Sequence, residues 1–174
     1  MKSILISIKP KWVAKILNGE KTIEVRKTYP KCELPITVYI YCTKTIKGVS
    51  SYDWGDFTFD DLPKLGKVVA KFTLREIDGV PCLDHFNPND AEKTCISWVN
   101  LGKYVGNKHF YAWHISDLVI FRKPRELWEF SYGKPRCLLK SKGGVVINGF
   151  NFLDDELHVI KRPPQSWCYV EELK

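Results

Sequence analysis

The sequence contains no long apolar run, no low-complexity tract and no internal repeat. No stretch approaches the roughly 18 apolar residues that a membrane-spanning helix needs. The apolar residues near the N-terminus are few and alternate with polar ones, whereas a signal peptide has a continuous apolar centre. We therefore expect a cytoplasmic protein that makes no membrane contact.

Generic enzyme motifs are also missing, among them a Gly-rich phosphate loop, Gly-x-Ser-x-Gly and His-Glu-x-x-His. No two of the six cysteines form a Cys-x-x-Cys pair, so we expect free thiols in a reducing compartment. Cys82 and His85 have a Cys-x-x-His spacing, which Cys95 and His109 could complete as a metal site. Separate thiols and a surface histidine are the favoured interpretation. We predict neither a metal nor a cofactor.

The chain has 174 residues, which suits one domain, and we predict a single domain over 1–174. Aromatic residues make up 13%, with ten prolines and eleven glycines, and these counts favour compact β-rich packing over a helical bundle. Lys and Arg exceed Asp and Glu by 27 to 20, giving a net charge of +7. This excess suits a polyanionic partner such as nucleic acid or nucleotide, although many proteins carry such a charge for solubility.

Alternating apolar residues predict five strands, at 3–8, 22–26, 36–42, 68–77 and 109–121. A short helix is predicted over 10–18, because Pro10 suits a first helical turn and Asn18-Gly19 suits a helix end. Asn87 is a plausible cap for a second helix over 88–98. We expect a turn or short helix over 124–130 and a final strand at the end of 163–170.

Two segments have no clear periodicity. Residues 44–66 are expected to form a long loop, and residues 131–162 are expected to form an inserted hairpin or lobe. Together these elements predict an α+β, mainly β domain. We expect a small barrel or curled sheet, with the early helix closing one end.

The most informative motif is Gly19-Glu20-Lys21-Thr22-Ile23-Glu24-Val25-Arg26. Lys21 lies where the helix turns into the strand, and Glu24 and Arg26 share one face of that strand. One interpretation is a solvated strand face with a weak ion pair. The other is a cleft whose cation contacts phosphate while the carboxylate and guanidinium contact a base edge.

This motif resembles the hallmark Gly-x-Lys-x-x-Glu-x-Arg of the ASCH family, a branch of the PUA-like superfamily. Further matching segments follow in order, at Ile8-Lys9-Pro10, Val38-Tyr39-Ile40-Tyr41-Cys42, Gly66-Lys67-Val68-Val69 and Tyr111-Ala112-Trp113-His114-Ile115. The ending Arg162-Pro163-Pro164-Gln165-Ser166-Trp167-Cys168-Tyr169-Val170 resembles phage and Gram-positive bacterial members. The resemblance covers about residues 3–130 and the tail.

The resemblance implies a PUA-like β-barrel whose early helix lies beside a cleft that binds RNA or a nucleotide. Some relatives are amidohydrolases acting on acetylated cytidine through a Lys, a Thr three residues later and a distant Glu. Here Lys21 matches that Lys, but Glu24 occupies the Thr position. Another relative is a ribonuclease whose catalytic residues include the hallmark Lys. Lys21 and Glu24 are therefore the candidate catalytic residues, with Glu24 as a general base.

The candidate ligand-binding residues extend beyond the hallmark, and the full set is Lys9, Trp12, Lys21, Glu24, Arg26, Gln165, Ser166 and Trp167. Lys9 belongs to a basic N-terminal third. Trp12 and Trp167 can stack on a base, although packing in the core is the commoner role for any one aromatic residue. Gln165 can pair with adenine and Ser166 can bond to any base.

Three functions follow from these residues. The first is a binding module for RNA or a modified nucleotide, and the second is a hydrolase that acts on a nucleoside or RNA at the same residues. The third is an interaction protein of a phage or mobile element that uses residues 131–162 as its contact surface. A Lys-Glu-Arg cluster facing a pocket would favour the first two.

Overall fold

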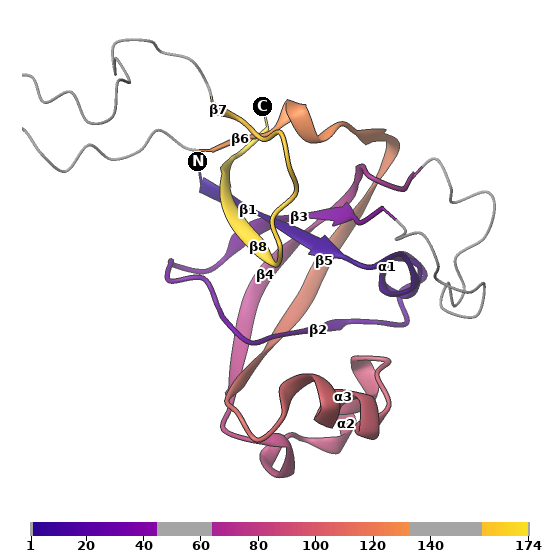
Figure 1. The fold of residues 1–174 in the computed structure, drawn as a ribbon, viewed down its shortest axis with the longest axis vertical. Coiled ribbons are helices and arrows are strands. Elements are labelled where there is room, and N and C mark those ends of the chain that lie inside the picture. Colours follow the sequence, from indigo (N-terminus) through magenta and orange to yellow (C-terminus); the bar gives the residue numbers. More distant parts are fainter. Residues whose placement is uncertain (1, 45–63, 133–157, 174) are drawn as a thin grey trace, which may run out of the picture.

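A computed structural model describes residues 2–44, 64–132 and 158–173 of the chain. Six strands form a sheet in the order β2-β5-β4-β3-β1-β8 (Figure 1). These strands are β1 Lys2–Ile8, β2 Ile23–Arg26, β3 Ile36–Cys42, β4 Val68–Val80, β5 Phe110–Arg125 and β8 Trp167–Glu171. Strands β1 and β3 run parallel, and the other neighbours run antiparallel. The mainly β fold class predicted from the sequence is confirmed.

The first helix, α1, spans Pro10–Leu17 and confirms the short helix predicted there. Proline at the first position already has the helical φ, and the helix buries its apolar face through Val13, Ala14 and Ile16. Gly19 follows with a φ of 79°, a left-handed conformation that glycine adopts without steric strain. This turn directs the chain into β2.

The predicted helix over 88–98 is wrong in its extent, because the chain forms two helices, α2 at Pro88–Lys93 and α3 at Trp98–Val105. Asn87 does cap α2, since its side chain accepts a hydrogen bond from the Asn89 backbone N–H. The helix stops at Thr94, whose hydroxyl donates to the Ala91 carbonyl and accepts from the Ile96 N–H. Such local bonding competes with helix continuation. Cys95 then turns the chain with a φ of 56°.

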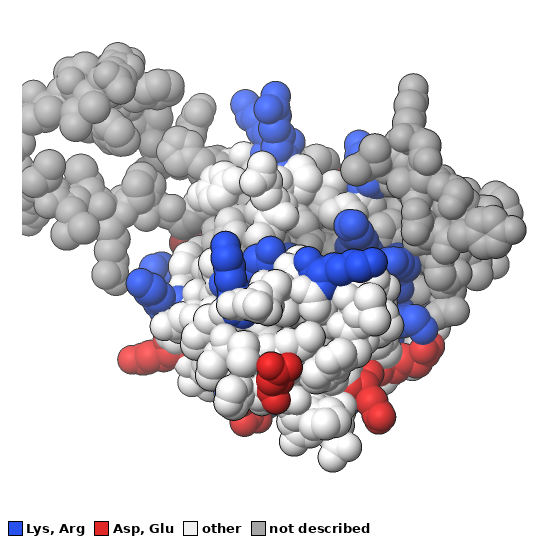
Figure 2. All heavy atoms as spheres, turned by 60° about the horizontal axis from the view of Figure 1, so that its bottom comes forward, with Lys and Arg blue, Asp and Glu red and all other residues white. Residues whose placement is uncertain are grey.

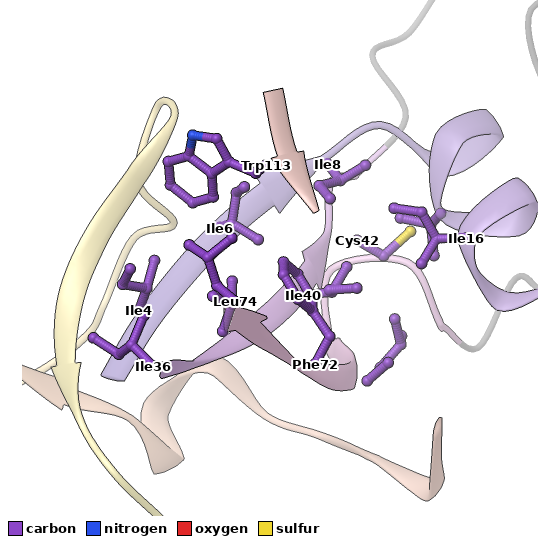
Figure 3. Packing of buried hydrophobic residues seen from close by; sticks show 14 of the residues in the cluster. Ile4, Ile6, Ile8, Ile16, Ile36, Ile40, Cys42, Phe72, Leu74 and Trp113 are labelled. Atoms are coloured by element: carbon purple, nitrogen blue, oxygen red, sulfur yellow. The ribbon is translucent and has the colours of Figure 1, made fainter. Parts of the chain in front are cut away.

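Both faces of the central strands are buried. Figure 3 shows the larger cluster, in which Ile4, Ile6 and Ile8 of β1 pack with residues of β3, β4 and α1. On the opposite face, Leu5 and Tyr39 pack against Phe130, Ile160 and residues of β8. Alternation in β3 placed Tyr39 and Tyr41 on this second face, and the returning C-terminal segment covers it. A third cluster joins β2 to α2 and α3.

The remaining strands extend the sequence predictions. Strand β4 continues three residues beyond the predicted end at Ile77, and β5 is a 16-residue strand that runs to Arg125. A 3-10 turn, η4 at Leu127–Glu129, lies within the turn predicted over 124–130. A second one, η3, spans Leu83–His85 between β4 and α2.

Most of the expected loop at 44–66 and of the expected insert at 131–162 lies outside the described residues. The described ends of the second segment form short strands, β6 at Ser131–Tyr132 and β7 at His158–Val159, which pair antiparallel. The sheet itself remains open, because β2 and β8 are its two edges and the described backbone makes no ladder between them. Across the described residues, no helix is long and apolar enough to span a membrane.

Candidate functional site

Lys21 occupies the corner between α1 and β2 predicted from the sequence. Its backbone N–H donates to the Lys15 carbonyl, and the next N–H, from Thr22, donates to the Lys93 carbonyl. These bonds fix the corner against both α1 and the end of α2. The Lys21 side chain consequently points inward, and none of it is exposed.

The ammonium group of Lys21 has a partner for each of its three N–H donors. Its Nζ lies 2.7 Å from the Ile23 carbonyl, 2.8 Å from the Thr94 carbonyl and 3.2 Å from Glu24 Oε2. Burial lowers the pKa of Lys21 below its ordinary value, because a charged amine loses hydration there, and the nearby Glu24 carboxylate partly opposes this shift.

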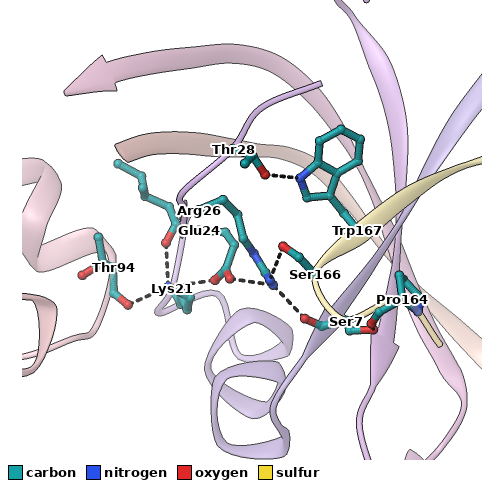
Figure 4. Close-up of polar contacts among 10 residues, drawn as sticks. Ser7, Lys21, Glu24, Arg26, Thr28, Thr94, Pro164, Ser166 and Trp167 are labelled. Carbon is teal, nitrogen blue, oxygen red and sulfur yellow. Dashed lines mark hydrogen bonds and ion pairs between the residues drawn. The ribbon is translucent and has the colours of Figure 1, made fainter. Parts of the chain in front are cut away.

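Glu24 also binds Arg26, whose Nη2 lies 3.0 Å from Glu24 Oε1 (Figure 4). Lys21, Glu24 and Arg26 therefore form one buried ion cluster, which we call the triad. Each of its side chains is exposed by 9% or less. Two cations share one carboxylate, so the triad carries a net charge of +1 when all three groups are ionised.

Arg26 connects the triad to the far edge of the sheet. Its Nη2 donates to the Ser7 carbonyl at 2.7 Å, and its Nη1 donates to Ser166 Oγ at 3.2 Å. The third nitrogen of the guanidinium, Nε, is buried, and its N–H has no hydrogen-bond partner among the described residues. A buried donor without a partner is uncommon in proteins and is expected where a ligand or water completes a site.

Side chains bridge the two sheet edges that the backbone leaves unpaired. Ser166 directly precedes β8 and reaches Arg26 of β2, while Trp167 Nε1 donates to Thr28 Oγ1 at 3.0 Å just beyond β2. Ser7 Oγ also donates to the Pro164 carbonyl at 2.7 Å. The open sheet is thus closed at this point by side chains, and the triad lies at the closure (Figure 4).

The structure brings together Lys21, Glu24, Arg26, Ser166 and Trp167 from the set of candidates. Trp12 is also adjacent, because Lys21 Nζ lies 5.6 Å from the centre of its ring. Lys9 and Gln165 are exposed and make no described bond to the triad. The Trp167 ring is partly buried and packs against Trp113 and Tyr169, with ring centres 5.8 and 5.5 Å apart.

Two residues near the triad were missed by sequence reasoning. Tyr104 of α3 is close enough for the charges of Arg26 and Glu24 to act on its pKa, which burial raises. Lys27 Nζ lies 5.0 Å from the centre of the Tyr104 ring. Cys95 is near enough to Lys21 to act electrostatically on it. Both residues could have been found only if the sequence had indicated a helix end near Thr94 and a new helix after it, whereas the pattern predicted one helix over 88–98.

No group of three or more His, Cys, Asp or Glu side chains in the described part of the chain could hold a metal ion. Cys82 Sγ does lie 3.0 Å from His85 Nδ1, as their spacing allows. Cys95 is located instead near Lys21, and His109 stacks on Tyr111 with ring centres 4.9 Å apart.

Comparisons with solved structures identify proteins that share this fold. No family model and no curated protein matches the sequence. Among solved structures, an ASCH protein from Zymomonas mobilis matches with a TM-score of 0.60 and 17% identity, over 98% of this chain and 88% of that chain. A serine-to-alanine variant of that protein matches with a TM-score of 0.60, 18% identity and coverages of 98% and 89%. At this level of identity the likeness establishes the fold.

Proposed function

We propose that this chain, which has the fold of the ASCH proteins, is a binding module for RNA or a modified nucleotide centred on the triad. The observation that carries the proposal is a cluster, at least nine-tenths buried, in which two basic side chains share one carboxylate, so that its net charge is +1 when all three groups are ionised. Charges are weakly screened in such surroundings, so an arriving anion is strongly favoured there. Phosphate is the anion that arginine binds best, because the planar guanidinium matches its oxygens.

The unpartnered Nε of Arg26 is the second support for a ligand. A phosphate oxygen or a base carbonyl would supply the acceptor that this donor lacks. Ser166, already 3.2 Å from Arg26 Nη1, can turn its hydroxyl toward the same ligand because a hydroxyl both donates and accepts. These two side chains are the direct contacts that we assign.

Lys21 has a different part in this proposal. Because its three donors are occupied and its side chain is fully buried, it supplies charge and holds Glu24 in place. Trp12 and Trp167 border the triad and offer rings to a base, and Lys9 and Gln165 lie on the surrounding surface. Figure 2 shows Lys and Arg side chains gathered in a band across one face of the molecule, with acidic side chains at its lower part. Such a field attracts a polyanion.

A hydrolase at the same residues is the second candidate, and the lowered pKa of Lys21 favours it. A lysine that loses its proton can act as a base or nucleophile. The three acceptors around its Nζ would have to release it first. The binding module therefore has the better support.

The test measures binding of short single-stranded RNA and of a panel of modified nucleosides and nucleoside monophosphates, with mass spectrometry of every mixture. Arg26→Lys keeps the positive charge and removes the planar guanidinium with its paired N–H donors. The control, Arg75→Ala, removes an exposed cation of β4. We expect saturable binding that weakens at least about tenfold in Arg26→Lys, is unchanged in Arg75→Ala and leaves the ligand intact. Equal, salt-dependent binding by wild type and Arg26→Lys would contradict the proposal. Product formation that is lost in Lys21→Met would identify an enzyme.

The finer expectations from the sequence remain proposals. We propose a cytoplasmic protein. On the resemblance of residues 162–170, we also propose that it belongs to the phage and Gram-positive bacterial branch. We also propose one domain over 1–174, with an insert at 131–162. A contact role of that insert for a phage or mobile element is supported by no described residue.

A further inference from the structure

A hollow lies away from the triad, where β5 ends and η4 begins. Its volume is about 740 Å³, which is within the range of small-molecule pockets, roughly 300–1,000 Å³. Figure 1 shows this end of β5 and the following turn, in orange, at the top of the molecule, whereas β2 lies in its lower half. We call the hollow the η4 groove and define it by Lys67, residues 120–126, Trp128 and Glu129.

The charges of the η4 groove favour an anion. Four cations line it, Lys67, Arg122, Lys123 and Arg125, against two carboxylates. Both carboxylates are already paired, because Glu126 binds Lys67 at 2.7 Å and Glu129 binds Arg125 at 3.1 Å. Arg122 and Lys123 are exposed and make no ion pair with any described residue. Two cations are thus available to an incoming group.

The groove also holds the most exposed tryptophan of the described chain. Trp128 is 65% exposed and makes no ring contact with another described residue. Its backbone is fixed, because Glu126 and Glu129 form a reciprocal capping box around η4, and Phe130 is fully buried. Leu127 packs on the other side against the same cluster as Phe130. The fold therefore holds a flat apolar ring in solvent on a rigid turn.

We infer that the η4 groove binds single-stranded nucleic acid, with Arg122 and Lys123 on the phosphates and Trp128 stacked on a base. An acidic peptide would satisfy the two cations, but it has no need of an exposed indole. Single-stranded nucleic acid offers a partner for both features, because a base can stack on the ring while the phosphates meet the cations. This contact is separate from the triad, so a protein with a disabled triad would still bind single-stranded RNA, but more weakly than the wild-type protein.

The experiment measures the affinity of the full chain for a fluorescent single-stranded 12-mer RNA by anisotropy at several salt concentrations. Trp128→Ala is expected to weaken binding about tenfold and to leave the salt dependence unchanged, because the ring is uncharged. The double variant Arg122→Ala/Lys123→Ala is expected to weaken binding and to reduce the salt slope by about 1.4, at about 0.7 for each phosphate contact. Trp98→Ala, an exposed tryptophan of α3 at the other end of the molecule, is the matched control and should bind like wild type.

Wild-type affinity of Trp128→Ala, or an equal loss in Trp98→Ala, would overturn the inference. Crosslinking of RNA containing 4-thiouridine provides an independent readout, and adducts on the peptide that carries Trp128 are expected. Adducts confined to other peptides would also overturn it. Nucleoside monophosphate binding separates the two proposals, because Arg26→Lys should weaken it at least about tenfold and Trp128→Ala should leave it unchanged. The two proposals can therefore be refuted separately, one by nucleoside monophosphate binding and the other by RNA binding.

Discussion

Replacing Glu24 with glutamine tests whether the triad stabilises the fold. Glutamine has nearly the shape of glutamate, so the substitution removes a charge while preserving packing. In the wild-type protein the two Glu24 oxygens lie 3.2 Å from Lys21 Nζ and 3.0 Å from Arg26 Nη2. After the change, two buried cations would face each other without a shared anion.

The magnitude follows from the burial of these groups. Removing one partner of a buried ion pair destabilises a protein by about 3–5 kcal/mol, because the remaining charge has neither water nor counterion. That is a large part of a typical unfolding free energy of about 5–15 kcal/mol. For a chain of this size, where about 1 kcal/mol shifts Tm by 2–4 °C, we expect Tm to fall by roughly 6–20 °C.

Thermal and urea unfolding followed by circular dichroism provide the assay. The control is Asp117→Asn, which removes a carboxylate from the shorter 2.7 Å ion pair with Arg75, where both side chains are 58% exposed. We expect little change in the control, since solvent screens an exposed pair. A Glu24→Gln protein whose Tm falls no further than that of Asp117→Asn would refute the argument that burial makes this cluster stabilising.

Three further predictions concern single groups. First, the stability deficit of Glu24→Gln should shrink as pH rises from 7 toward 10. Without Glu24, burial and the nearby Arg26 charge lower the Lys21 pKa further below its ordinary value of 10.5. The unfolded state then binds more protons than the folded state, so stability rises with pH; a deficit that is constant in urea melts across this range would contradict it. Second, Gly19→Ala should destabilise the protein by about 1–2 kcal/mol in urea unfolding, because the φ of 79° is strained for alanine while its added Cβ meets no atom within 4 Å; an unchanged midpoint would argue against that backbone conformation. Third, Cys168 should resist iodoacetamide in the native protein at pH 8, because burial raises its thiol pKa to about 11 and leaves about one thiolate in a thousand. Peptide mass spectrometry would detect the labelling, and rapid native modification of Cys168 would be the contrary result.

Much of the local structure could be predicted because it depends on neighbouring residues. Pro10 and Gly19 mark the two ends of α1, and alternation in β3 separates Val38 and Ile40 from Tyr39. The prediction of one helix over 88–98 was wrong, and the reason is also local. The Thr94 hydroxyl bonds to backbone groups on both sides of it, and a pattern of apolar residues carries no sign of that competition.

The sequence by itself determined that Glu24 and Arg26 share a strand face and that Lys21 lies at the preceding corner, because a strand has a period of two and Gly19 ends the helix before it. Tertiary structure alone decided which groups complete the triad. The carbonyls of Ser7 and Thr94 accept from Arg26 and Lys21, and every residue has a carbonyl, so no residue type announces this role. Ser166 is 140 residues from Arg26 in the chain. It reaches β2 because β8 pairs with β1 and the sheet curls, so that its two edge strands lie close enough for a side-chain hydrogen bond. The same contact between the two edges buries the triad, and burial strengthens the electrostatic interactions of its charges because water no longer screens them.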